Sequence, residues 1–295
     1  MALDHFIAGL LVLTTAFAAA ARAAETSIPD FSGMWGRNTF DFEAVPSGPA
    51  PVKNTYRLPS GSSDPTRPIG DYKNPLLKPE AAAIVKQRAE KALKGETFPD
   101  PSTRCAPYPP PFVFAMQLGL QMLQKKNEIT ILYNQDDQVR HIRVNAKHPE
   151  HMTLSWKGDS VAHYEDDTLV IDTIGIKADS FSVVDRYGTP MGEGAHVVER
   201  YRLVDAAEAK RAQTEHEKEA GRLGGAMPID ESYGKGLELQ LIIENPTYFT
   251  RPLVVRVTYT RTTLPWQELI CAENAVNPYA VAASPPIPKA DKPDF

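Results

Sequence analysis

The sequence is poor in cysteine, lacks a cluster of basic residues and, beyond its first 24 residues, lacks a long apolar run. Its 32 Lys and Arg stand against 37 Asp and Glu, which gives a net charge of −5. A nucleic-acid-binding protein needs a concentrated positive surface, so the composition argues against that class. A membrane-spanning helix needs ~20 apolar residues, and no later segment approaches this length. We therefore expect no nucleic-acid partner and no membrane association of the mature chain.

Several motifs that would assign a reaction are also missing. Without G-x-S-x-G there is no sign of an α/β-hydrolase serine. Without a P-loop or a G-x-G-x-x-G sequence, a bound nucleotide is not indicated, and no H-E-x-x-H motif marks a zinc site. The sequence therefore predicts no cofactor.

The first 24 residues have the character of a secretory signal. Residues 6–21 form an Ala-rich apolar stretch that is short for a membrane span. The small residues on either side of Arg22 fit an A-x-A cleavage site. The leading segment is atypical because it carries Asp4 and His5 but no Lys or Arg, and a short uncleaved anchor is the alternative. We predict a signal peptide over residues 1–24 and a periplasmic or secreted protein.

The two cysteines, Cys105 and Cys271, lie far apart in the sequence. In an exported protein an even pair indicates a disulfide. Closing so long a loop stabilises a fold by roughly 4–5 kcal/mol in the chain-entropy description. The alternative is a catalytic thiol, which needs an activating partner, and neither cysteine has an adjacent His. We predict a Cys105–Cys271 disulfide.

The first part of the mature chain, residues 25–111, is an extended segment rich in Pro, Gly and Ser. Such a composition leaves little apolar surface to bury. Within it, Pro79 suits a first helical turn, and the residues that follow predict a helix as far as Leu93. Residues 112–123 fit a helix, a hydrophobic plug or a strand equally. An extended tail is expected over residues 276–295.

From about residue 128 apolar and polar residues alternate, which is the period of β-strands. About nine short strands follow one another with turn signals between them, and Gln135–Asp137 joins the first two as a hairpin. Residues 205–227 are strongly helical and interrupt the series. We predict a mainly β protein. Its domain over residues 112–275 is an antiparallel calycin- or lipocalin-like barrel or a curved sheet, with a Pro-rich N-terminal wrap and one inserted helix.

One ionisable residue falls on the predicted inner face of this sheet. Along residues 196–205, Val197, Glu199 and Tyr201 share the more apolar face, because side chains alternate along a strand. A buried carboxylate is costly unless it is paired, and burial raises its pKa. Glu199 is therefore either an acid/base candidate or the structural partner of an Arg or of a Tyr hydroxyl.

The acidic residues 165–167 come directly before another strand, at residues 168–173. Asp and Glu in such turns normally serve solvation and backbone hydrogen bonding, so we interpret these carboxylates as turn residues. Asp172 lies near the far end of the strand, where a pocket mouth is expected. It is the better functional candidate.

The segment KHPEHM offers a metal clip in His148 and His151, with Glu150 or His141 as a further ligand. A catalytic zinc site needs three placed ligands and an open position. The spacing matches no strong motif, so no metal site is predicted, and binding by His148 and His151 stays open.

Five stretches of the mature sequence share the order and spacing of a known pattern. They are DFSGMWG, SWKGDSVAHYEDDTLVIDTIG, HVVERYRLVD, ENPTYFTRP and CAEN. These resemble the patterns W-x-G-x-S…W-E-G-D-T-L-V-V-D-T, H-x-x-E-R-F, T-R-P and C-x-E-N of a large family of uncharacterised exported bacterial proteins. The chain departs from that pattern at His163, Tyr164, Asp166 and Asn245 and in the charged helix.

The resemblance implies export and a β-barrel, and it carries no reaction. It marks a set of polar and aromatic positions in this sequence. They are Trp156, Asp172, His196, Glu199, Arg200, Glu244, Arg251, Glu273 and Asn274.

These features favour a protein that takes a small, largely apolar molecule, aromatic or isoprenoid, into the cavity of the barrel. If it is an enzyme, we expect cofactor-independent acid/base chemistry, as in a lyase, isomerase, cyclase or dehydratase. The alternative is a non-catalytic ligand carrier. The predicted catalytic residues are Glu199, His196, Asp172 and His141, and the predicted substrate-binding residues are Trp156, Tyr164, Tyr201, Arg140 and Arg251. No feature of the sequence sets the oligomeric state.

Overall fold

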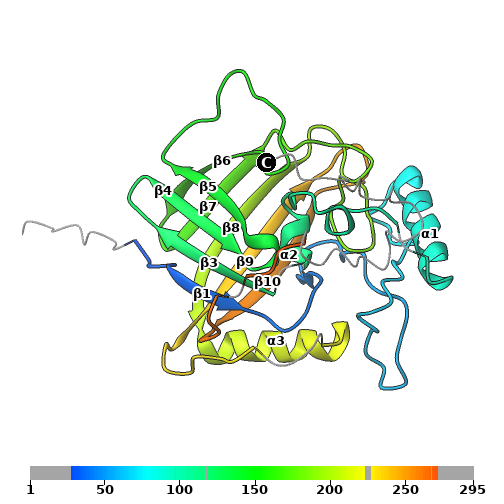
Figure 1. Ribbon diagram of the computed structural model, residues 1–295, viewed down its shortest axis with the longest axis horizontal. Coiled ribbons are helices and arrows are strands. Elements are labelled where there is room, and N and C mark those ends of the chain that lie inside the picture. The colour runs from blue at the N-terminus through cyan, green and yellow to red at the C-terminus, as the bar shows by residue number, and fades with distance from the viewer. Residues whose placement is uncertain (1–27, 97, 117, 223–226, 267, 272–295) are drawn as a thin grey trace, which may run out of the picture.

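The computed structural model describes residues 28–96, 98–116, 118–222, 227–266 and 268–271. They form a β-barrel with helices and irregular segments packed around it (Figure 1). The strands are β1 (Gly33–Gly36), β2 (Glu43–Ala44), β3 (Gly119–Gln124), β4 (Glu128–Tyr133), β5 (Gln138–Val144), β6 (Asp159–Glu165), β7 (Thr168–Ile174), β8 (His196–Asp205), β9 (Lys235–Glu244) and β10 (Leu253–Arg261).

Nine of these strands close into a ring. Strand β1 pairs with β3 on one side and with β10 on the other, so that β1 and β3 to β10 follow one another around the barrel. Strand β2 pairs with β10 as an extra strand. All neighbours are antiparallel except β5 and β6, which run parallel because the chain crosses over between them. The predicted mainly β barrel with an inserted helix is confirmed, and this one parallel pair makes its sheet mixed.

The strand that closes the ring comes from the Pro-rich segment. Trp35 of β1 lies opposite Leu120 of β3 and opposite Arg261 of β10. Its side chain is fully buried, and the indole nitrogen donates a hydrogen bond of 2.9 Å to Phe31 O. The N-terminal segment therefore contributes to the barrel wall as well as wrapping around it.

The helices are α1 (Pro79–Leu93), α2 (Phe112–Met116) and α3 (Ala206–Ala220), with the short 3-10 turns η1 (Ser102–Arg104) and η2 (Gln135–Asp137). Helix α1 has the predicted bounds. Its buried residues Ala81, Val85 and Ala89 are spaced by four, which places them on one face. Residues 112–123, for which a helix, a plug and a strand were equally expected, contain a helix and the start of a strand: α2 ends at Met116 and β3 begins at Gly119.

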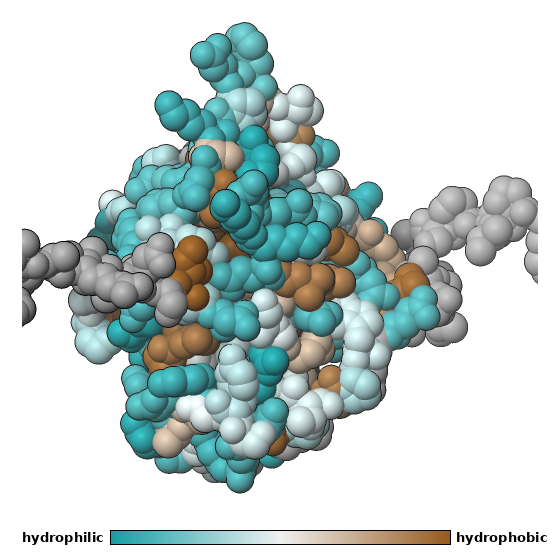
Figure 2. Space-filling view, turned by 90° about the vertical axis from the view of Figure 1, so that its left-hand side faces the viewer, coloured by the Kyte–Doolittle hydropathy of each residue, from teal (hydrophilic) through white to brown (hydrophobic). Residues whose placement is uncertain are grey.

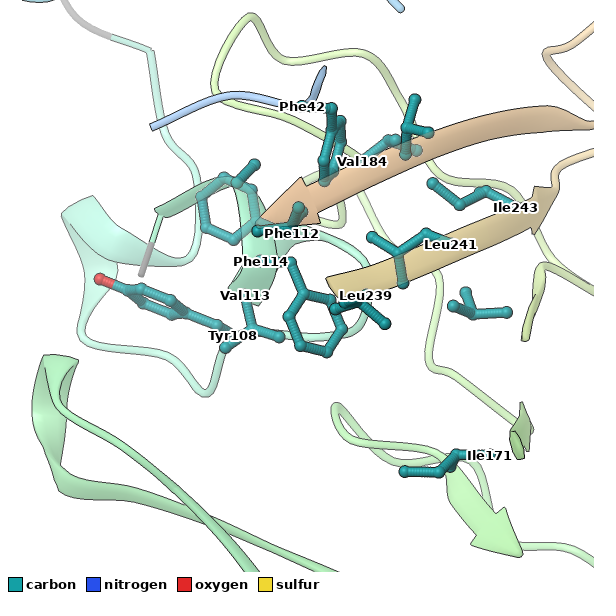
Figure 3. Close-up of a cluster of buried hydrophobic side chains, with 14 of the residues drawn as sticks. Phe42, Tyr108, Phe112, Val113, Phe114, Ile171, Val184, Leu239, Leu241 and Ile243 are labelled. Carbon is teal, nitrogen blue, oxygen red and sulfur yellow. The ribbon is translucent and has the colours of Figure 1, made fainter. Parts of the chain in front are cut away.

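Helix α2 reaches into the barrel core. Phe112, Val113 and Phe114 are fully buried in one cluster with Leu239 and Leu241 of β9 (Figure 3). The ring of Phe114 meets the ring of Tyr133 edge to face, with centroids 6.0 Å apart. Helix α2 therefore works as a hydrophobic plug.

Helix α3 follows β8 and lies across the outside of β8, β9 and β10 (Figure 1). The Gln213 amide donates hydrogen bonds to Gly36 O at 3.0 Å and to Thr258 O at 3.1 Å. A Cβ atom on Gly236 of β9 would lie 2.2 Å from the Cβ atom of Ala209. Glycine at this position is what lets the helix approach the strand so closely.

The predicted disulfide is present. Cys105 follows η1, and its Cα atom lies 5.5 Å from that of Cys271, 166 positions later in the chain. The bond ties the segment before α2 to the segment that follows the last strand.

Strand faces also match the prediction. Val197, Glu199 and Tyr201 of β8 are fully buried, while His196 and Arg200 are on the outer face and partly exposed. Residues 152–158 contribute only an isolated bridge, between Ser155 and Ile176.

The face of the molecule on the side of β3 and β4 is mostly hydrophilic, with hydrophobic residues in separate places (Figure 2). None of the described helices combines the length and the apolar character needed to cross a membrane. The predicted signal (1–24), the predicted tail (276–295), Glu273 and Asn274 lie outside the described residues.

Candidate functional site

Glu199 lies inside the barrel, opposite a buried arginine. Its Oε1 atom is 2.7 Å from Nη2 of Arg140, and neither side chain is more than 2% exposed. The hydroxyl of Tyr201 donates a hydrogen bond of 2.8 Å to Glu199 Oε2. Of the two interpretations of Glu199, the structural pair with an Arg and a Tyr hydroxyl is present in the structure.

The arginine of this pair has further partners. Arg140 Nη2 donates to Ser160 Oγ at 2.9 Å and to Thr173 Oγ1 at 2.6 Å. Burial alone would lower the pKa of Arg140, but the negative charge of Glu199 raises it above its ordinary value. Burial, together with Glu199, also raises the pKa of Tyr201. The barrel interior therefore holds a polar network in which the carboxylate charge is already neutralised.

A second ionic cluster lies on the outer face of the barrel. His148, in the crossover before β6, lies between two carboxylates. Its Nδ1 is 2.6 Å from Asp159 Oδ1, and its Nε2 is 3.0 Å from Asp172 Oδ1. Arg143 of β5 donates to both oxygens of Asp159, at 2.7 and 2.8 Å.

The cluster continues through His196, which lies directly opposite Glu244 in the pairing of β8 with β9. The Nε2 atom of His196 is 3.0 Å from Asp172 Oδ2, and its Nδ1 is 3.1 Å from Glu244 Oε2. The structure thus brings together two of the four predicted catalytic residues, His196 and Asp172. We call Arg143, Asp159, His148, Asp172, His196 and Glu244 the outer ion-pair chain.

The hydrogen bonds of His196 set its charge. Carboxylate oxygens only accept hydrogen bonds, so a ring with a carboxylate at each nitrogen is favoured in its doubly protonated form. Partial burial lowers the pKa of His196, but the hydrogen bonds to Asp172 and Glu244 outweigh it and raise the pKa above the ordinary value. Asp172 and Glu244 therefore favour the imidazolium form of His196, with one carboxylate accepting from each ring nitrogen.

A pocket of about 370 Å³ adjoins the end of this chain. We call it the Glu244 pocket. It is lined by Lys78, Gly194, Glu244, Asn245, Pro246, Phe249, Thr250, Arg251 and Pro252. Lys78 Nζ donates to Pro246 O at 2.5 Å, and Phe249 is 3% exposed. Arg251, a predicted substrate-binding residue, is exposed and makes no hydrogen bond or ion pair with the described residues.

The barrel interior itself is occupied by side chains. Its inward-facing residues belong to one buried cluster, and α2 fills the space beside β9. Four hollows in the described part of the chain are lined mainly by loops and surface residues. The sequence predicted a ligand cavity inside the barrel. In the described residues the space for a small molecule lies outside the barrel wall instead.

The other predicted site residues lie elsewhere. His141 is on the outer face of β5 beside Glu128, at 3.1 Å, and is 69% exposed. Trp156 lies under the ammonium of Lys177, 5.1 Å from the ring centroid. Tyr164 accepts a hydrogen bond of 2.9 Å from Gln124. Among the described residues, none of these three makes a hydrogen bond or an ion pair with a member of the outer ion-pair chain.

Lys157 is a perturbed residue that the sequence does not single out. Its Nζ donates to Tyr108 O at 2.8 Å and to Gln138 Oε1. Burial, with the nearby charge of Arg140, lowers the pKa of Lys157 to about 7. Because its partners lie 49 and 19 positions away, only the fold creates this environment.

The described residues form no metal site. Among the residues that the structure describes, no group of three or more His, Cys, Asp or Glu could hold a metal ion. His151 is exposed, while His148 is engaged by Asp159 and Asp172 instead of forming a clip with His151.

No protein-family model, curated protein or solved structure matches this chain. The resemblance to exported bacterial proteins therefore stays a prediction. The candidate site rests on its own geometry: the outer ion-pair chain and the Glu244 pocket at its end.

Proposed function

We propose that this exported protein binds a small molecule in the Glu244 pocket and acts on it by cofactor-independent acid/base chemistry of the lyase, isomerase, cyclase or dehydratase kind. One observation carries the proposal. Glu244 lines the pocket and at the same time holds Nδ1 of His196. A proton on His196 is therefore one hydrogen bond away from the pocket wall.

The lining defines the kind of ligand. Phe249, Pro246 and Pro252 offer apolar contacts suited to an aromatic or isoprenoid body. Lys78 and Arg251 offer positive charge for a carbonyl or an anionic group at one end. In the proposed reaction the Glu244 carboxylate takes a proton from the ligand, and Arg251 stabilises the negative charge that develops on the ligand. Glu244 then returns the proton to another atom of the ligand or to its leaving group. The Nδ1–H of His196 holds the Glu244 carboxylate in place.

The second candidate is a non-catalytic carrier that uses the same pocket. The observation that favours it is the occupation of both ring nitrogens of His196 by carboxylates. An imidazole held in this way can be a purely structural link between strands. Under this alternative Arg251 binds the ligand, and the outer ion-pair chain only fixes the pocket wall.

Native mass spectrometry tests the proposal on protein purified from its natural source, followed by extraction and identification of bound small molecules. The comparison is made among the wild type, Arg251→Gln and Arg211→Gln. Arg211 is exposed on α3 and carries the same charge, which makes it the matched control. We expect the wild type and the control to carry the same molecule and Arg251→Gln to carry about tenfold less. Equal retention by all three proteins contradicts binding in this pocket.

The identified molecule then separates the two candidates. An enzyme converts it, and His196→Gln lowers turnover while binding stays close to that of the wild type. A carrier releases it unchanged, and His196→Gln then alters stability alone.

A further inference from the structure

A second hollow is lined by none of the residues of the outer ion-pair chain. It has a volume of about 520 Å³, within the usual range for small-molecule sites. Its walls come from residues 65–68, from the end of α1, from the segment around η1 and from Arg186 in the connection between β7 and β8. We call it the Arg186 hollow.

Two arginines lie on one wall, since Arg186 Nη2 donates a hydrogen bond to Pro65 O beside Arg67. The side chain of Arg186 is only 11% exposed, and its nearest carboxylate oxygen, on Asp41, is 4.0 Å away. Its Nε atom is buried and makes no hydrogen bond. The facing Asp41 Oδ1 is likewise buried and makes no hydrogen bond. Arg186 therefore has Asp41 as its counter-charge but keeps an unused N–H donor.

Hydrogen bonds from Thr66 lower the pKa of Asp64, and the charges of Arg67 and Arg186 lower it further, so Asp64 is a nearby counter-charge for both arginines. Arg67 is held in place by a tyrosine. Its Nη1 donates to the hydroxyl of Tyr56 at 2.9 Å, and its guanidinium lies 5.0 Å from the centroid of that ring. It forms no ion pair with any described residue. Stacking on Tyr56 holds the planar group in place, which reduces the entropy lost when it binds an anion.

A third arginine lies next to a residue that lines the hollow. Arg88 of α1 packs over the ring of Phe98, 4.7 Å from its centroid, and Phe98 lines the hollow. Arg88 Nη1 is buried and makes no hydrogen bond. Burial lowers the pKa of Arg88, and Asp100 and Asp185 only partly offset this effect. Arg88 therefore adds a third guanidinium group, also with an unused N–H donor, next to a residue that lines the hollow.

Two carboxylates, Glu96 and Asp100, also line the hollow. Asp100 is engaged locally, because its Oδ1 accepts hydrogen bonds from Ser102 Oγ at 2.6 Å and from Thr103 N at 2.9 Å. Phe98 and Met116 add apolar surface. The hollow therefore combines guanidinium groups, carboxylates and apolar surface, which suits an amphiphilic molecule.

We propose that the Arg186 hollow is a second binding site, for a small organic anion of the aromatic carboxylate class. Its carboxylate pairs with Arg186 and Arg67, and its ring packs on Phe98 and Met116. Arginine matches the geometry of a carboxylate by donating two parallel hydrogen bonds. This site shares no lining residue with the Glu244 pocket, so it stands independently of the proposed function.

Binding of benzoate, observed by NMR chemical-shift perturbation on the full protein, tests the site. Benzamide is the neutral comparison of the same shape, and inorganic phosphate is the anion without a ring. The variants are Arg67→Gln and Arg186→Gln. Arg211→Gln, on the exposed face of α3, is the control with the same loss of charge. Because Arg67 is exposed, its replacement keeps the fold even if the buried Arg186 does not tolerate change.

We expect benzoate to shift the amide signals of the non-proline residues at the hollow, namely Thr66, Arg67, Phe98, Asp100, Ser102, Thr103 and Arg186. Benzamide should bind at least about tenfold more weakly. Arg67→Gln should weaken benzoate about tenfold, while Arg211→Gln should leave it unchanged. Phosphate that binds as tightly as benzoate overturns the aromatic part of the proposal. Equal binding of benzoate and benzamide, equal binding by Arg67→Gln and wild type, or no shifts at these residues overturns the site.

Discussion

At the scale of single residues, the Arg140–Glu199 pair places two opposite charges in the barrel interior. Both side chains are buried, so loss of one charge leaves the other without compensation. We expect Glu199→Gln to lower the free energy of unfolding by about 3–5 kcal/mol, measured by urea denaturation at pH 7. Glu165→Gln is the control, because it removes an exposed partner of Arg200 and should cost about 1 kcal/mol or less.

A catalytic role for Glu199 would give a different pattern. If Glu199→Gln kept its stability but lost activity on the identified ligand, the acid/base interpretation would replace the structural one. The double variant Arg140→Met, Glu199→Leu distinguishes the cost of an unpaired buried charge from the loss of side-chain packing. It should recover much of the stability lost by Glu199→Gln, since an apolar pair needs no counter-charge.

His196 makes the outer ion-pair chain sensitive to pH. Its pKa in the folded protein is raised by Asp172 and Glu244. A histidine whose pKa is higher in the folded than in the unfolded state adds to the free energy of unfolding. This contribution is complete below the unfolded pKa of about 6.5 and is lost as the pH rises through the folded pKa. His196→Gln should therefore cost about 1 kcal/mol at pH 6 and less at pH 9, by urea denaturation. A cost that does not change between these pH values would show that His196 is not held as an imidazolium.

Lys157 has the opposite dependence. Its folded pKa is lowered to about 7, so between pH 7 and about pH 10 the unfolded chain binds a proton that the folded chain does not. Stability of the wild type should rise over this range because of Lys157, and Lys157→Met should lack that rise. The stability of Lys157→Met relative to the wild type therefore falls from pH 7 to pH 10. Lys177→Met, at a half-exposed lysine, should show no such trend.

At the scale of elements, α2 completes the core that the barrel cannot fill alone. Phe114 is fully buried, packs on Tyr133 and carries a carbonyl that accepts a hydrogen bond from Arg37 at 3.0 Å. Phe114→Ala removes a large apolar side chain and leaves a cavity, so we expect a loss of about 3–5 kcal/mol in thermal or urea unfolding. Leu93→Ala, at the exposed end of α1, should change stability by about 0.5 kcal/mol or less. A similar loss in both variants would mean that α2 does not plug the core.

The elements also show how far sequence patterns reach. Helix α1, helix α3 and the faces of β8 follow from local periodicity, because each pattern is complete within one segment. The closure of the barrel by β1 and the parallel pairing of β5 with β6 depend on partners far away in the chain. Period-two alternation places a side chain on a face but does not say which strand comes next to it.

The same limit applies to the candidate site. Alternation put Glu199 inside and His196 outside, and both placements hold. It did not show that His148 would join Asp172 to Asp159, because the three residues come from the crossover, β7 and β6. It also left Lys157 unnoticed, since the burial that perturbs its pKa is made by residues distant in sequence.

At the scale of the whole molecule, the Pro-rich segment and the barrel form one structure. Strand β1 closes the ring and β2 extends it, while α1 and the residues around η1 build the Arg186 hollow. Ser102 and Thr103 line that hollow. They lie three and two positions before Cys105 in the sequence. The disulfide therefore connects the N-terminal half of the chain to the segment after β10 at the edge of a proposed binding site.

Breaking this connection should destabilise the whole protein. A closed loop of 166 positions removes a large amount of entropy from the unfolded chain, worth up to roughly 4–5 kcal/mol, although measured values are often smaller. We expect the double variant Cys105→Ser, Cys271→Ser to unfold at a lower urea concentration than the oxidised wild type. Dithiothreitol should bring the wild type close to the variant and leave the variant itself unchanged. If the oxidised wild type and the variant unfold together, the bond contributes no net stability, and its role is confined to holding Ser102 and Thr103 at the hollow. Benzoate affinity would then fall in the variant while its unfolding midpoint stays the same.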